Sequence, residues 1–276
     1  MHSVITIAQN EIRIGIRNRW VVLASVILLV FALVLVLLGS APTGATKTDS
    51  LTVVVASLST LTVYLVPLIA LLLSFDAIAG EIDKGTLQLT FATPVSRADV
   101  LLGKFLGHLF VLSLAVIIGY GAAGGVSFFF NPETPWSSLV DLTRLIGTSI
   151  ILGGTFIAIG YVASTSVRQT GTAAAVAISI WLFTVVLYDL ALLGGLLISV
   201  DGYFAKVLFP YFLLLNPADA FRVFNMSAIE TSGFSTGLDS GGQQMPLAPK
   251  FAMLSPLVWT GVALVISTVI LKRVQP

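Results

Sequence analysis

Six long apolar runs constrain this chain more than any other feature. They cover roughly residues 20–39, 52–75, 100–128, 143–164, 173–200 and 252–271. An α-helix rises about 1.5 Å per residue, so about 20 apolar residues cross the hydrocarbon core of a bilayer. Only 10% of the residues are charged and 57% are hydrophobic, which leaves too few polar groups to cover a soluble protein. The sequence therefore predicts an all-α integral membrane protein with six transmembrane helices, in which residues 1–276 form one transmembrane domain surrounded by lipid.

The composition also excludes several kinds of site. The chain has no cysteine, so disulfides and thiolate metal sites are excluded, and its formal net charge of +1 argues against a nucleic-acid partner. Two histidines, His2 and His108, are too few for a histidine-built metal centre. Met226, Met245 and Met253 form no tight cluster that would bind a soft metal. We expect no metal site and no cofactor in this chain, and a packing or hydrogen-bonding role for His108.

Lysine and arginine counts predict the orientation. The termini and the even-numbered connections carry nine such residues: Arg13, Arg17, Arg19, Lys84, Arg97, Lys104, Arg168, Lys272 and Arg273. The two short loops on the opposite side carry only Lys47 and Arg144. Because cytoplasmic loops are enriched in positive residues, we expect both termini to lie in the cytoplasm of a multi-pass protein of the bacterial inner membrane.

Two segments outside the six runs are also apolar. Before the first run, apolar side chains recur every three or four residues, at Ile5, Ala8, Ile12 and Ile16. This spacing favours an interfacial amphipathic helix over a frayed basic leader. Before the last run, the apolar residues 207–215 are too few to cross the membrane and precede Asn216-Pro217. We expect a re-entrant or interfacial piece there, within a long periplasmic segment of about 201–251.

A charged island of about residues 76–104 separates the second and third runs. Glu81 and Asp83 favour the start of a short helix, and Pro94 disfavours helix in the residue before it. Ser96 has the position of a helix cap, with Asp99 at the third helical position. The pattern predicts a compact cytoplasmic knob made of a helix, a proline corner and a second helix. A docking surface and a solvated connector both fit this knob.

The island contains a Gly-Lys pair but no nucleotide site. A P-loop requires a glycine five positions before its Gly-Lys pair and a serine or threonine after it. Ala98 and Phe105 occupy these places around Gly103-Lys104. We therefore expect ATP and its magnesium to be bound by another chain.

Asp189 lies well inside the fifth run. An ionised carboxylate at the bilayer centre costs about 2.5–3.5 kcal/mol on insertion scales, so it should face the bundle, a partner or a water-filled cavity. A substrate or proton site on the translocation route and a structural hydrogen bond both remain open for it. The sequence offers no second ionisable residue close to it.

Small residues suggest where helices approach closely. Glycines recur four residues apart at Gly103 and Gly107 and at Gly121 and Gly125, and a Gly153-Gly154 pair lies in the fourth run. This spacing predicts tight packing of the third and fourth spans.

Three motifs of the island resemble those of a known family. They are Glu81-x-x-x-Gly85-Thr86-Leu87, Pro94-Val95-Ser96-Arg97 and Leu101-Leu102-Gly103-Lys104. They resemble the cytoplasmic loop of type-2 ABC exporter permeases, as does the six-span layout. The resemblance implies that the loop is a coupling helix seated in a cleft of a separate cytoplasmic ABC ATPase. The implied coupling residues are Glu81, Lys84, Gly85, Pro94 and Arg97.

Residues 63–76, 103–108 and 213–219 are similar to the Nos membrane permeases, which serve nitrous oxide reductase maturation. This resemblance implies a homodimer with two ATPase subunits and a periplasmic β-helix accessory protein on the outer loops. A copper chaperone or the reductase would be further partners. Asn216, Pro217 and Asp219 are the candidate contacts for the periplasmic partner. The implied role is assembly of the copper–sulfur sites of the reductase.

The predicted function is therefore that of a permease subunit without catalytic residues of its own. It would couple ATP hydrolysis by its partner to transport or to conformational work in the periplasm. An ion-coupled secondary transporter and a non-transporting membrane anchor remain alternatives. The sequence does not distinguish a sulfur cargo, a copper cargo and no cargo.

Overall fold

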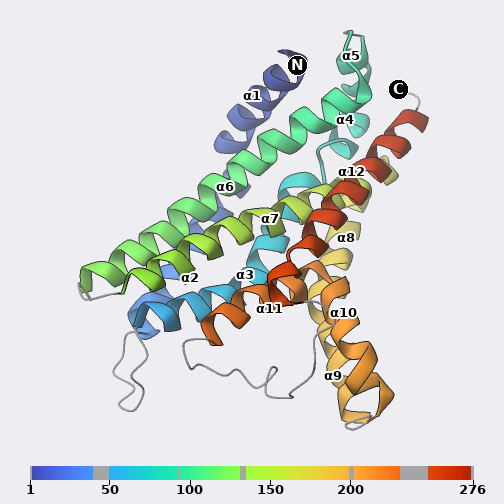
Figure 1. Ribbon diagram of the computed structural model, residues 1–276. Helices are drawn as coiled ribbons and strands as arrows, with labels where there is room; N and C mark the ends of the chain where they lie inside the picture. Colours follow the sequence, from blue (N-terminus) through green and yellow to red (C-terminus); the bar gives the residue numbers. More distant parts are fainter. Residues whose placement is uncertain are drawn as a thin grey trace.

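The computed structural model describes residues 2–39, 50–92, 94–130, 135–198, 202–230 and 248–274 (Figure 1). All the regular elements in these ranges are helical, which confirms the predicted all-α class. Five helical stretches are each long and apolar enough to cross a membrane. They contain α3 (Ser50–Ser74), α6 (Arg97–Phe130), α7 (Trp136–Ser166), the continuous helix α8–η1–α9 (Thr170–Trp181, Leu182–Leu187 and Tyr188–Ile198), and α12 (Leu254–Arg273).

Two further pairs of helices are bent. The helix α1 (His2–Arg17) meets α2 (Arg19–Gly39) at a bend of 66°. The stretch formed by η2 (Phe204–Leu208) and α10 (Phe209–Leu215) meets α11 (Pro217–Glu230) at 104°. Counting each pair as one span gives up to seven candidate spans, a range that includes the predicted six. The second pair lies where the re-entrant piece was expected, and Asn216 provides the extended backbone between its two arms.

The helices pack around α7. This helix contacts α3, α6, α11 and α12, while α1 and α2 both lie along α6. Its side chains Phe156 and Tyr161 are fully buried, as is Tyr120 of α6. The start of α1, the end of α12 and the helices α4 (Ala79–Asp83) and α5 (Leu87–Phe91) lie at one end of the bundle, which we call the α4–α5 end (Figure 1). The helices α9 and α10 project at the opposite end.

Burial is uneven among the long helices. In the most apolar stretch of each helix, 67% of the residues of α7 are buried, against 17% of those of Thr170–Ile198 and 22% of those of Pro249–Arg273. Because these last two helices expose apolar side chains along most of their length, the bundle is open to lipid or to another protein on that side.

The glycine pair Gly103 and Gly107 forms a shallow groove on α6 that receives α1. A Cβ atom on Gly103 would lie 2.7 Å from the Cβ of Ile7, and one on Gly107 would lie 2.6 Å from the Cβ of Glu11. Such separations are too short for real side chains, so only glycine allows α1 to approach this closely. The spacing of Gly103 and Gly107 therefore allows close packing of α1 against α6, and not the predicted packing of the third span against the fourth.

The other glycines bear out the predicted packing of the third and fourth spans only in part. Gly153 and Gly154 of α7 lie against Leu112 and Leu109 of α6. By contrast, Cβ atoms at Gly121 and Gly125 would meet nothing within 4 Å. The expectation was wrong for this second pair, because it lies on an open face of α6.

Replacing Gly107 tests the docking of α1. We expect Gly107→Val to destabilise the protein by about 1–3 kcal/mol, because the new side chain overlaps Glu11 and the carbonyl of Ala8. Gly121→Val is the matched control, since it makes the same change on the same helix in open space. Thermal unfolding of both variants in detergent gives the measurement. Equal melting temperatures would contradict the described packing of α1.

Candidate functional site

The charged island folds into a knob made of α4 and α5, residues 79–91. Gly85 separates the two helices with a φ of +68°, a conformation that favours glycine. The N–H of Gly85 and that of Thr86 donate to the carbonyls of Ile82 and Glu81, which closes α4. After Pro94, the Ser96 hydroxyl accepts the N–H of Asp99 at 3.0 Å and caps α6 as predicted.

The base of the knob is fixed to the bundle. The Ser164 hydroxyl of α7 accepts the backbone N–H groups of Ile78 and Ala79, both at 2.9 Å. Asp83, at the end of α4, accepts the hydroxyl of Thr170 at 2.9 Å. Since these contacts bind α4 to α7 and α8, the knob does not hang freely from the ends of α3 and α6.

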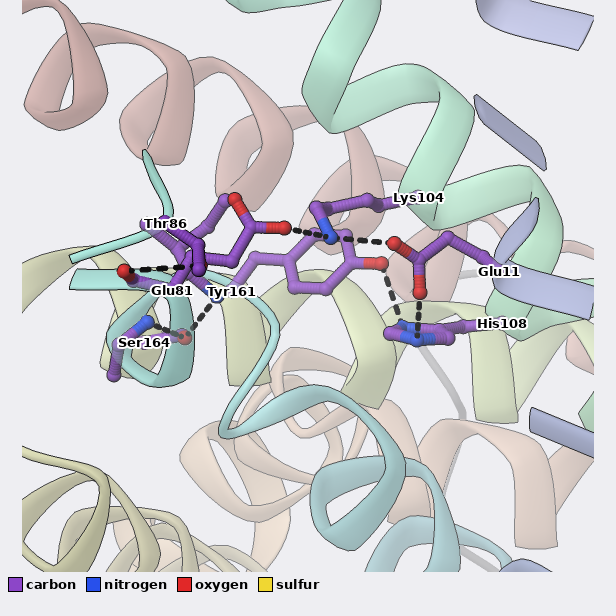
Figure 2. Close-up of polar contacts among 9 residues, drawn as sticks. Glu11, Glu81, Thr86, Lys104, His108, Tyr161 and Ser164 are labelled. Atoms are coloured by element: carbon purple, nitrogen blue, oxygen red, sulfur yellow. Dashed lines mark hydrogen bonds and ion pairs between the residues drawn. The ribbon is translucent and has the colours of Figure 1, made fainter. Parts of the chain in front are cut away.

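A buried lysine joins the knob to two other helices. The Lys104 ammonium lies 2.5 Å from Glu11 Oε1 of α1 and 2.8 Å from Glu81 Oε1 of α4 (Figure 2). Its side chain is only 6% exposed. A buried charge is strongly destabilising unless it is paired, so Lys104 depends on these two carboxylates. One side chain of α6 thereby connects α1 with the knob.

The same cluster reaches α7 through a histidine. Glu11 Oε2 lies 3.4 Å from His108 Nε2, and His108 Nδ1 shares a 2.8 Å hydrogen bond with the Tyr161 hydroxyl (Figure 2). His108 thus has the hydrogen-bonding role expected of it. We call Glu11, Glu81, Lys104, His108 and Tyr161 the Lys104 cluster.

Glu11 is the anion at the centre of this cluster. Burial alone would raise the pKa of its carboxyl, but the hydrogen bond from His108 and the charge of Lys104 outweigh burial. Together they hold this pKa at about 2, so Glu11 is ionised at every physiological pH. Glu11 could not be singled out from the sequence, because its partners Lys104 and His108 lie more than 90 residues away. The signal available was its place beside the periodic apolar positions, three residues after Ala8 and next to Ile12.

A polar cavity of about 160 Å³ adjoins the cluster. It is lined by Glu11, Ile14, Gly15, Asn18, Leu73, Asp76, Ala77, Gly80, Glu81, Lys84, Thr86, Lys104 and His108. The second carboxylate oxygen of Glu81 is buried there without a hydrogen-bond partner among the described residues. Asp76 also lines this cavity beside the cluster.

The other predicted coupling residues occupy two places. Lys84, Gly85 and Pro94 are exposed on the surface of the island, whereas Glu81 turns inward to Lys104. Leu89 of α5 is 71% exposed beside them. Sequence reasoning missed Leu89, although an apolar residue in a charged loop is a recognisable signal.

Arg97 contacts the last helix. Its Nη1 atom donates to the carbonyls of Leu271 and Val274, the latter at 2.7 Å, and its guanidinium lies 4.8 Å from the ring centre of Phe91. Cations stabilise the C-terminal end of a helix, where carbonyls lack partners. Arg97 thus ties the knob to the end of α12.

A second charged cluster surrounds Asp189. The two terminal nitrogens of Arg222 in α11 bind Asp189 Oδ2 at 3.0 Å and Asp219 Oδ1 at 3.2 Å. The sequence suggested no partner for Asp189, because Arg222 follows it by 33 residues. The bend before α11 brings these residues together. This ion pair satisfies Asp189 inside the chain, and its place on a translocation route stays a prediction.

Asn216 holds the same bend. Its Nδ2 atom donates to Asp219 Oδ2 at 2.9 Å and to the carbonyl of Thr184 at 2.8 Å. Thr184 lies in the π-helical turn η1, and such turns alter the regular backbone hydrogen bonds of a helix. Asn216, Pro217 and Asp219 are all buried within the chain, so in this structure they support the bend. Their contact with a periplasmic partner stays a prediction.

In the part of the chain that the structure describes, no group of three or more histidine, aspartate or glutamate residues is arranged to hold a metal. Met226 and Met253 pack in the apolar core, and Met245 lies outside the described residues.

Comparison with known proteins decides the family. The profile of a family described as ABC-2 family transporter protein matches residues 5–275. The chain belongs to this ABC-2 transporter family. A relative from Stutzerimonas stutzeri, named "Probable ABC transporter permease protein NosY", is 38% identical over 274 residues, which cover 99% of both chains. A relative of the same name from Pseudomonas aeruginosa strain PAO1 is 37% identical over the same share. The chain is thus a multi-pass ABC transporter permease, and the motif resemblance is confirmed.

Removal of the Lys104 charge tests the cluster of this ABC-2 permease. We expect Lys104→Met to cost about 3–5 kcal/mol, because it removes the cation shared by the buried Glu11 and the partly buried Glu81. Adding Glu81→Gln should cost less in the Lys104→Met background than in the native chain. Chemical unfolding of the two single variants and the double variant measures this coupling.

Arg144→Met is the control for these variants. The ion pair between Arg144 and Asp141 is more exposed than the Lys104 cluster, so it should contribute at most about 1 kcal/mol. Additive effects of Lys104→Met and Glu81→Gln would show that the two residues do not interact.

Proposed function

We propose that this chain is the permease subunit of an inner-membrane ABC transporter whose separate ATPase docks on the α4–α5 knob. The observation that carries the proposal is the ion pair between Glu81 and Lys104. Because Glu81 belongs to the knob and Lys104 to α6, a force on the knob acts directly on the bundle. Glu11 passes the same force to α1. ATP and magnesium belong to the partner, and this chain forms a single permease domain without its own catalytic or cofactor site.

The exposed surface of the knob suits a protein partner. Lys84 and Gly85 project from the turn between α4 and α5, and Leu89 presents an apolar side chain beside them. An exposed apolar side chain such as Leu89 suits the buried core of a protein interface, and Lys84 suits its polar rim. Nine lysines and arginines on this side, against two in the two short loops on the other, support a cytoplasmic knob and cytoplasmic termini.

We further propose that the permease serves assembly of the copper–sulfur sites of nitrous oxide reductase. The shared name of the two relatives and the motifs at residues 63–76, 103–108 and 213–219 support this role. A second copy of the chain would cover Thr170–Ile198 and α12, whose apolar faces are poorly buried. A periplasmic β-helix protein would bind the outer segment that follows α9, and a copper chaperone or the reductase would join there.

The charged cluster at Asp189 supports a second candidate, an ion-coupled transporter. Asp189 and Asp219 share one guanidinium, which leaves one negative charge that a proton or cation would neutralise. Powering by ATP remains the better proposal, because an ion-coupled transporter would have no use for an exposed knob tied to the bundle by a buried lysine. The third possibility, a membrane anchor, would use the knob but not Asp189.

Disruption of the knob surface tests ATPase docking. We expect Leu89→Asp combined with Lys84→Glu to reduce co-purification of the ATPase with this chain by at least about tenfold, the effect of losing about 1.4 kcal/mol or more of binding free energy. Lys250→Glu is the control for charge reversal, because Lys250 is exposed near the opposite end of the bundle. Affinity purification from native membranes followed by quantification of the ATPase gives the answer. Undiminished co-purification, or no ATPase with the native chain, would refute docking on the knob.

The Asp189→Asn variant distinguishes transport from anchoring. If Asp189 lies on a translocation route, this variant should keep the ATPase bound but lose reductase maturation, measured by the copper content of the reductase. Normal maturation would remove Asp189 from that route.

A further inference from the structure

An apolar groove of about 210 Å³ lies on the outside of the bundle where α1, α2 and α6 meet. It is lined by Ile16, Val22, Ser25, Val26, Leu29, Val111, Leu114, Ala115 and Ile118. Ser25 is the one residue among them with a polar side chain. A groove of this composition would not retain a water-soluble ligand, so its occupant must be apolar.

The groove is elongated along α6. A Cβ atom on Gly15 would touch Val111, and one on Gly119 would touch Leu28, so α1 and α2 follow α6 in the same direction. The lining on α6 extends from Val111 to Ile118, which is about 10 Å along the helix axis at about 1.5 Å per residue. An apolar groove that runs parallel to a membrane helix can accommodate an acyl chain.

Two cations stand at the α1 end of this groove. Arg13 lies three residues before the lining residue Ile16, so the two share a side of α1, and Arg17 lies one turn beyond Arg13. Both arginines are exposed, and neither has a carboxylate partner among the described residues. The planar guanidinium group binds phosphate through two parallel hydrogen bonds.

The order of these features matches a lipid in a bilayer. The arginines lie on α1, before the membrane-crossing part of α2, and the apolar groove follows α2 and α6 away from them. The site thus has cationic side chains at one end and apolar side chains along the rest, which complements the anionic headgroup and the acyl chain of a phospholipid. We propose that the groove binds one acyl chain of an anionic phospholipid whose phosphate is held by Arg13 and Arg17.

This site has a consequence for the Lys104 cluster. The lipid covers the outer side of the bend between α1 and α2, while Glu11 holds the inner side of α1 to Lys104. A bound lipid therefore keeps α1 against α6 and supports the cluster from outside. The binding site itself does not rest on the proposed function, because lipid binding can be measured without the ATPase.

Native mass spectrometry of the full-length chain tests the site, with dioleoyl phosphatidylglycerol and dioleoyl phosphatidylcholine as probes. The native chain should retain the first lipid more strongly. Combined Arg13→Gln and Arg17→Gln should weaken phosphatidylglycerol binding by about 30-fold, which corresponds to about 1 kcal/mol for each charge. Arg168→Gln, at another exposed arginine of the same end, should leave binding unchanged.

A second variant tests the groove without altering charge. Val26→Trp should fill the groove and reduce retention of phosphatidylglycerol, whereas Ile117→Trp, on an exposed part of α6 outside the groove, should not. Thermal unfolding of each variant verifies that it is folded. Equal retention of both lipids by the native chain, or unchanged binding in the arginine pair or in Val26→Trp, would overturn the proposal.

Discussion

The Lys104 ammonium is the group on which the α4–α5 end of this protein depends. It is buried in a chain with few charges, and it is stable there only because Glu11 and Glu81 approach within 2.8 Å. Each carboxylate comes from a different helix. The need to pair one buried charge thus fixes α1, the knob and α6 relative to one another. Gly103 and Gly107 make this possible, because they let α1 come close enough for Glu11 to reach the lysine.

The charged clusters at the two ends of the bundle follow the same logic. Arg222 joins α9 to α11 as Lys104 joins α1 to the knob, and in both clusters one cation is shared by two carboxylates. Both clusters bind a short or bent helix to a long helix. The long helices are held by apolar packing and close contacts at glycines, whereas the pieces that must be placed at their ends are held by charge.

The sequence predicted the helices well because membrane insertion imposes a strong local rule. Runs of about 20 apolar residues predicted the long helices, and Pro94 and Ser96 predicted the start of α6. The break at Gly85, which divides α4 from α5, was not predicted. The clusters could not be found in this way. Glu11 and Lys104 are 93 residues apart, and Asp189 and Arg222 are 33 residues apart, so only tertiary structure brings them together. Gly121 and Gly125 show the same limit, since their spacing alone did not reveal whether a helix lies against them.

Because Lys104 joins the knob to α1, the two should move as one body. Spin labels at Gln88 on α5 and Gln9 on α1, both exposed, measure this directly in the complex with its ATPase. We expect the distance between these labels to stay constant when ATP binds, and its distribution to widen in Lys104→Met. A large change in this distance in the native complex on ATP binding, or identical distributions with and without Lys104, would show that Lys104 does not join the knob to α1.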